Sequence, residues 1–131
     1  MKFVRFEFDL ADAATPALFS ALPQALREFS VAIDLWPATP AAGHPSEPWV
    51  RLMWACAPDG ATPGRWVCEQ VIARWQAESL DAVSASLLPA RDPAAVRLPP
   101  LLEGGHPVFV LDERRFTGEA ALASLVTALR T

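Results

Sequence analysis

The order of strand-like and helix-like segments predicts one α/β domain over residues 1–131. Residues 3–36 contain a strand, a helix and a second strand, the pattern of a parallel strand–helix–strand unit. Residues 46–89 have mainly helical periodicity, and residues 107–129 contain two short strands with a tight turn, then a helix. We therefore expect a helical insertion at about 46–89, between the second strand and the strand that follows Pro107.

The first strand, residues 3–9, has the clearest alternation in the sequence. Arg5 and Glu7 occupy one face, and apolar side chains occupy the positions beside them. Thr15 and Pro16 then predict the start of a helix, with threonine as the N-cap and proline at the first helical position. The sequence thus predicts a strand with one apolar face, followed by a loop and a capped helix.

Residues 49–57 allow two interpretations. As a strand, this run places Arg51 between Trp49 and Met53 on one face; as a helix, it aligns an apolar stripe and turns Arg51 away. We predict a helix. The strand alternative would indicate a ferredoxin-like α+β interaction domain, so the secondary structure of this run decides between two fold classes.

Two further helices are expected before the C-terminal strands. Residues 67–75 place apolar side chains on one helical face, and a shorter helix begins near Leu80 and ends before a proline. Leu87 and Leu88 are both expected to point inward from that shorter helix. Residues 90–105 are expected to be mostly loop.

Composition limits the classes of partner. The sequence has 11 basic and 15 acidic side chains and a net charge of -4, so it has no electrostatic footprint for nucleic acid. No apolar run reaches the roughly 18 residues that a membrane-spanning helix needs. The first residues lead directly into strand-like sequence without a signal-peptide pattern, so the cytoplasm is the expected compartment.

The two cysteines do not have the spacing of a functional pair. Cys56 and Cys68 are far apart in the sequence and form no C-x-x-C motif. We therefore expect neither dithiol oxidoreductase activity nor a metal site. Both residues lie in apolar helical stripes and are expected to be inert core thiols.

The C-terminal stretch has the most specific pattern in the sequence. Gly104-Gly105 allows a sharp turn, His106-Pro107 leads into an apolar strand, and Asp112-Glu113 predicts the turn of a hairpin. Phe116-Thr117-Gly118 is expected to lead into the last helix, which should begin near residue 117 or 118.

Several short motifs of the sequence occur together in one order. This order resembles that of the 2-hydroxychromene-2-carboxylate isomerases, which are DsbA-like thioredoxin-fold proteins related to kappa-class glutathione transferases. The resemblance spans nearly the whole chain and implies a thioredoxin-like fold with a reduced helical insertion. It also implies a cis peptide bond before Pro107. The motifs are Phe8-Asp9-Leu10, Leu22-Pro23-Gln24-Ala25-Leu26, His44-Pro45, Pro58-Asp59-Gly60, Val67-Cys68-Glu69, Leu88-Pro89-Ala90-Arg91-Asp92-Pro93, Pro107-Val108-Phe109-Val110-Leu111-Asp112 and Phe116-Thr117-Gly118.

The resemblance also implies where a site would lie. Aligning Phe8-Asp9 and Leu22-Pro23 places Asp12 where the family has its catalytic serine, at the start of the first helix. A hydroxyl there helps to stabilise a glutathione thiolate, whereas a carboxylate repels it. The ligand-binding positions implied by the resemblance are His106, Pro107, Val108, Thr117 and Glu119.

Two functions follow from this comparison. With an active site, the protein would be a glutathione-dependent isomerase or transferase-like enzyme acting on a small aromatic or electrophilic substrate. Asp12, Ala120 and the missing part of the helical insertion favour a second function, in which a non-catalytic thioredoxin-fold protein binds a ligand or partner. A homodimer is also expected, because a shortened helical layer leaves apolar surface that small monomers rarely expose.

Overall fold

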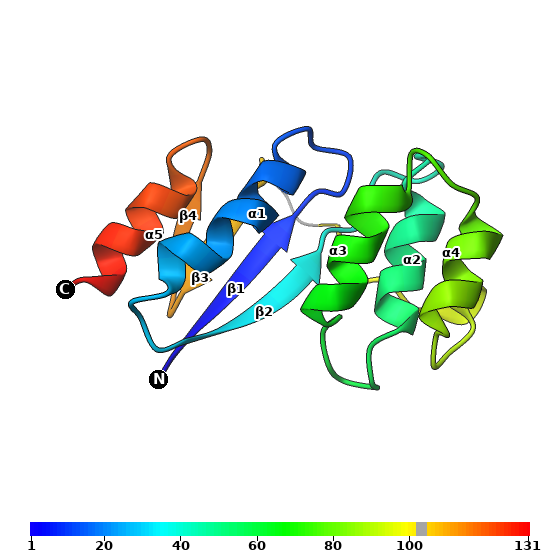
Figure 1. Cartoon of the computed structure of the whole chain (residues 1–131), viewed down its shortest axis with the longest axis horizontal. Helices are drawn as coiled ribbons and strands as arrows, with labels where there is room; N and C mark the ends of the chain where they lie inside the picture. The colour runs from blue at the N-terminus through cyan, green and yellow to red at the C-terminus, as the bar shows by residue number, and fades with distance from the viewer. Residues whose placement is uncertain (102–104) are drawn as a thin grey trace.

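A computed structural model describes residues 1–101 and 105–131 and contains a four-stranded mixed sheet (Figure 1). The strands are β1 (Lys2–Phe8), β2 (Val31–Pro37), β3 (Val108–Leu111) and β4 (Arg114–Thr117). Their order across the sheet is β2-β1-β3-β4. β1 is parallel to β2 and antiparallel to β3, and β3 is antiparallel to β4. The expected α/β class is therefore confirmed.

The helices form two groups around this sheet. The described residues contain α1 (Thr15–Leu26), α2 (Glu47–Ala55), α3 (Arg65–Arg74), α4 (Leu80–Leu87), α5 (Ala121–Leu129) and a short 3-10 helix, η1 (Pro93–Ala95). α1 and α5 lie on the same face of the sheet, whereas α2, α3 and α4 stand together beyond its β2 edge (Figure 1). The three helices between β2 and β3 thus extend the molecule sideways.

An aromatic cluster holds α1 against the sheet. The Phe6 ring stacks on Phe109 of β3, with ring centroids 4.5 Å apart, and it lies 5.4 Å from the ring of Phe19 in α1. The rings of Phe8 and Phe19 pack edge to face, with centroids 4.9 Å apart. Phe6, Phe8 and Phe109 are fully buried. The apolar face expected for the first strand therefore forms the centre of the core.

The opposite face of the sheet contains a buried ion cluster, formed by Arg5, Glu7 and Arg115. The Glu7 side chain is fully buried, and its two oxygens lie 3.1 Å from Arg5 Nε and 3.0 Å from Arg115 Nη2. Both arginines remain nearly half exposed. The Arg5 guanidinium also lies over the ring of Trp36, 4.9 Å from its centroid. Two flanking cations offset the cost of removing the Glu7 carboxylate from water.

The ambiguous run at residues 49–57 is helical, because most of it forms α2. Leu52 and Met53 are fully buried, while the Arg51 guanidinium donates from Nη1 to the carbonyl oxygen of Val96 at 2.6 Å. A helix buries the apolar stripe and leaves Arg51 free to reach this carbonyl. The prediction of a helix is confirmed, and the ferredoxin-like alternative, which required a strand here, is wrong.

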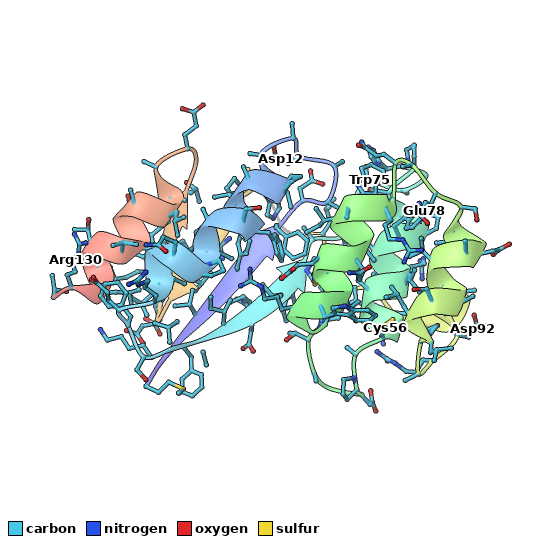
Figure 2. The ribbon with its side chains drawn as sticks, in the orientation of Figure 1. Asp12, Cys56, Trp75, Glu78, Asp92 and Arg130 are labelled. Atoms are coloured by element: carbon cyan, nitrogen blue, oxygen red, sulfur yellow. The ribbon has the colours of Figure 1, made fainter. Side chains whose placement is uncertain are left out.

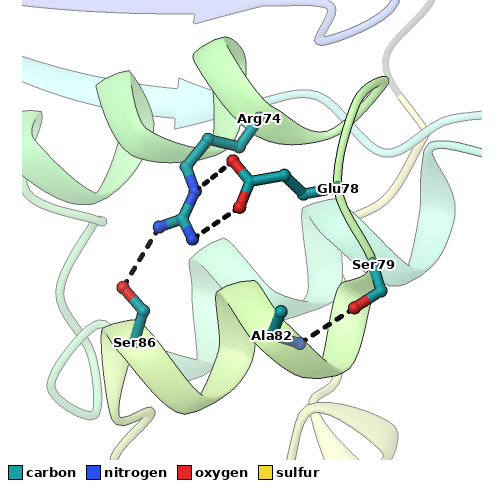
Figure 3. A network of polar contacts seen from close by, with 5 residues as sticks. All are labelled: Arg74, Glu78, Ser79, Ala82 and Ser86. Carbon is teal, nitrogen blue, oxygen red and sulfur yellow. Dashed lines mark hydrogen bonds and ion pairs between the residues drawn. The ribbon is translucent and has the colours of Figure 1, made fainter.

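A polar network connects α3 to α4 (Figure 3). Arg74 forms a bidentate pair with Glu78, with distances of 2.7 Å from Nε and 2.9 Å from Nη2. Its Nη1 donates to Ser86 Oγ of α4 at 3.1 Å. Ser79 caps α4, since its hydroxyl oxygen accepts from the backbone N–H of Ala82.

Three helix ends differ from expectation. The Thr15 hydroxyl donates to the carbonyl oxygen of Asp9 at 2.6 Å and does not cap α1, because Thr15 is already the first helical residue. Leu88 is 80% exposed, because it adopts a left-handed conformation (φ 52°) after the last turn of α4. The final helix begins at Ala121 and not near Gly118, whose φ of 85° turns the chain first.

The stretch around Pro107 has the expected backbone. The His106–Pro107 peptide bond is cis, as predicted. Asp112 and Glu113 form the turn of the predicted hairpin between β3 and β4, and Asp112 adopts a positive φ of 55° there. Gly104, in the predicted glycine turn, lies outside the described residues.

Candidate functional site

A pocket of about 580 Å³ lies where α1 begins, next to the turn before β3 and the segment between β4 and α5. We call it the Pro107 pocket. Its lining includes the polar residues Asp12, His106 and Glu119, and also Pro107 and Gly118. Four of the residues that the sequence assigned to a site, Asp12, His106, Pro107 and Glu119, thus lie around one cavity.

Asp12 is held by the first turn of α1, in the loop that leads into that helix (Figure 2). Its Oδ1 accepts from the backbone N–H of Ala14 at 2.9 Å, and its carbonyl oxygen accepts from the N–H of Thr15 at 3.0 Å. The carboxylate therefore lies just before the N-terminal end of α1, although it does not cap the helix. A second anion at this position would have to compete with Asp12 for the same helix end.

One wall of the Pro107 pocket is apolar and comes from one face of α1 together with Ala14, the residue just before it. Ala14, Ala17, Leu18 and Ala21 follow the spacing i, i+3, i+4 and i+7 and line the cavity together. Sequence reasoning missed all four of these as site residues. Their signal was the small side chains on one helical stripe, which leave room beside the helix.

Two of the candidate ligand-binding residues do not line this pocket. Val108 is 2% exposed and sits in β3, where it pairs with Glu7 on one side and with Thr117 on the other. The register places the Val108 and Thr117 side chains on the face of the sheet that carries Glu7. That face is opposite to α1, so their side chains lie away from the pocket wall.

The charge of the Pro107 pocket does not suit the binding of a glutathione thiolate, which is an anion. Among the described residues, its lining includes two carboxylates, Asp12 and Glu119, and one histidine, but no lysine, arginine or cysteine. Two negative charges raise the energy of a further anion and lower the energy of a cation. The arrangement therefore favours a positively charged group on a bound molecule.

Neither cysteine lies at this pocket. Cys68 is fully buried in α3, and burial raises the pKa of its thiol far above the ordinary value. Cys56 follows the last residue of α2 and is partly buried, which also raises its thiol pKa (Figure 2). Because the thiolate is the reactive form, both residues lack the character of a nucleophile.

Comparisons with protein-family models, curated proteins and solved structures gave no match to this chain. Within residues 1–101 and 105–131, no three His, Cys, Asp or Glu side chains are grouped as metal ligands. In the same residues, no helix has both the length and the apolar character needed to cross a membrane.

Proposed function

We propose that this protein is a thioredoxin-like binding protein, related to the DsbA-like families, whose Pro107 pocket binds a small organic cation. In this proposal the protein does not activate glutathione. The observation that supports this proposal is the lining of the pocket, in which Asp12 and Glu119 accompany His106 and the described residues include no cysteine, lysine or arginine.

The topology supports the thioredoxin-like part of the proposal. A β1-α1-β2 unit and a β3-β4-α5 unit share one sheet, with α1 and α5 on the same face (Figure 1). Pro107 directly precedes β3 and meets the start of α1 across the pocket. This is the relation between helix and proline that the sequence resemblance implied.

The chemistry of the pocket supports a cation as ligand. The apolar wall of α1 can contact a hydrocarbon group, while the Asp12 carboxylate at the helix end can pair with an ammonium group. A thiolate in that place would face two like charges. At about 4 Å and an effective dielectric constant near 20, one such repulsion costs roughly 4 kcal/mol.

Calorimetric titration with two probes of similar shape and opposite charge tests the proposal. We expect 2-phenylethylamine to bind, and 3-phenylpropionate to bind at least about tenfold more weakly. Asp12→Asn should weaken binding of the amine by about tenfold. Asp34→Asn is the matched control, because Asp34 is exposed on β2 and does not line the pocket.

Two outcomes would overturn the proposed cation site. The first is equal binding of the amine and the acid, since it would mean that the carboxylates do not select charge. The second is an amine affinity that Asp12→Asn leaves unchanged. Circular dichroism of each variant separates a local effect on binding from a loss of folding.

The glutathione-dependent isomerase remains a second candidate, favoured by the placement of Asp12, His106, Pro107 and Glu119 around one cavity. Titration with glutathione distinguishes the two functions. Our proposal expects weak or undetectable binding, improved by Asp12→Ser or Asp12→Asn. Micromolar binding that either substitution weakens, together with turnover of 2-hydroxychromene-2-carboxylate, would favour the enzyme.

A further inference from the structure

We propose that a second pocket, distinct from the Pro107 pocket, binds a small aromatic anion. This cavity of about 830 Å³ lies beyond the β2 edge of the sheet and shares none of the described residues with the Pro107 pocket. We call it the Trp36 pocket. Its walls come from four separate segments: the end of β2, α2, the loop between α2 and α3, and residues 91–100.

Two tryptophans provide an aromatic wall. The rings of Trp36 and Trp54 meet edge to face, with centroids 5.0 Å apart and an angle of 80° between their planes. Trp54 is 7% exposed, and its Nε1 donates to the carbonyl oxygen of Pro37 at 3.2 Å. On the sheet side, the guanidinium of Arg5 lies over the Trp36 ring. These contacts fix both rings, so a planar ligand meets a preformed surface.

Two arginines make the Trp36 pocket positive. Arg91 is anchored by donation from Nη2 to the carbonyl oxygen of Trp54 at 2.8 Å. Its Nη1 lies 3.8 Å from the carboxylate of Asp59, which is 98% exposed, so this pair is well solvated and weak. Arg97 is exposed and has no carboxylate within 4.0 Å among the described residues. In a chain of net charge -4, the described lining of this pocket thus has two guanidinium groups and one carboxylate at its rim.

The segment that carries Arg97 is tied to the rest of the molecule on both sides. Arg51 of α2 donates to the carbonyl oxygen of Val96 at 2.6 Å. The Thr39 hydroxyl donates to the carbonyl oxygen of Pro99, also at 2.6 Å. The backbone beside Arg97 is therefore held in place without a ligand, and only the side chain must be ordered on binding.

The combination of side chains identifies the class of ligand. A guanidinium group pairs with a carboxylate through two parallel hydrogen bonds, and an indole ring packs against another aromatic ring. The cavity volume falls within the range of about 300 to 1,000 Å³ that is usual for small-molecule sites. The aromatic ring of the ligand would contact Trp36 and Trp54, and its anionic group would pair with Arg97 and Arg91.

The test uses biphenyl-4-carboxylate and its uncharged amide, biphenyl-4-carboxamide, in calorimetric titrations of the whole chain. We expect the carboxylate to bind at least about tenfold more tightly than the amide. Arg97→Gln should weaken binding of the carboxylate by about tenfold and leave binding of the amide unchanged. Because Arg97 is exposed, this variant is expected to keep the fold.

Two controls assign the effect to the Trp36 pocket. Arg27→Gln removes an exposed arginine outside the pocket and should leave the affinity for the carboxylate unchanged. Asp12→Asn alters the Pro107 pocket and should also have no effect. The proposal is overturned by absence of binding, by equal binding of acid and amide, or by an affinity that Arg97→Gln does not change.

Discussion

The two faces of the sheet bury side chains of different chemistry. Beneath α1, the rings of Phe6, Phe8 and Phe109 exclude water by packing alone. On the other face, Glu7 is equally buried but is covered by two arginines that remain nearly half exposed. Apolar packing gains from every atom removed from water, whereas the ion cluster gains little beyond the desolvation cost of its carboxylate. We therefore expect the aromatic face to dominate stability.

The largest expected effect comes from the aromatic face. Phe6→Ala should lower the free energy of unfolding by roughly 3–5 kcal/mol, because it leaves a cavity between Phe109 and Phe19. Phe3→Ala is the matched control, since Phe3 belongs to the same strand but is 69% exposed on the opposite face. Its effect should stay within about 0.5 kcal/mol. Urea unfolding followed by circular dichroism measures the free energy of unfolding of both variants. Similar losses of stability in the two would contradict the proposed difference between the faces of the sheet.

The ion cluster should respond more weakly. Arg115→Gln removes one cation from Glu7 and should cost about 1–2 kcal/mol, less than for a fully buried pair because solvent reaches the guanidinium. Its neighbour Arg114 contacts only the Phe116 ring among the described charged and aromatic groups. Arg114→Gln should therefore cost no more than about 0.5 kcal/mol. Equal losses in urea titrations would show that Glu7 does not depend on Arg115.

The two tryptophans of the Trp36 pocket allow a finer comparison. Trp54→Phe removes the donor to the carbonyl oxygen of Pro37 and should cost about 1 kcal/mol more than Trp36→Phe. Trp36 Nε1 is buried and has no acceptor among residues 1–101 and 105–131, so its removal relieves an unpaired donor. Thermal unfolding of both variants measures the difference. A greater loss for Trp36→Phe would mean that its N–H has a partner in solution.

The smallest effect belongs to an exposed ion pair, Arg74 with Glu78. The hydrogen bond from Arg74 lowers the pKa of Glu78 below its ordinary value of 4.5. The pair therefore contributes its stability above pH 4.5 and loses it as the pH falls through the lower, folded-state pKa. The stability of the natural protein and of Glu78→Gln should converge in acid and separate slightly at neutral pH. A difference that grows in acid would reverse the sign of this coupling.

The sequence predicted features that depend on neighbouring residues. Alternation in the first strand separated Arg5 and Glu7 from the phenylalanines, and an apolar stripe identified α2 as a helix. The prediction that Leu88 points inward was wrong, because periodicity does not indicate where a helix stops. The left-handed conformation of Leu88 after α4 turns its side chain to solvent.

Features that join distant segments could not be predicted in the same way. The contact between Glu7 and Arg115 depends on the register of two strand pairings and spans 108 positions. The Trp36 pocket draws its walls from four segments, none of which has a binding motif of its own. Four residues of the Pro107 pocket, Asp12, His106, Pro107 and Glu119, could be predicted because the resemblance supplied the long-range placement that local patterns lack.

The central position of β1 has a consequence for the order of folding during synthesis. β1 and β2 are synthesised before β3, which pairs with the other edge of β1 and follows it by about a hundred residues. Until then, the backbone groups along that edge of β1 have no strand partner and can pair with another nascent chain. Completion of the sheet must also await the closure of a very long loop, which slows folding. The synthesis of β3 thus determines when this edge of β1 is protected.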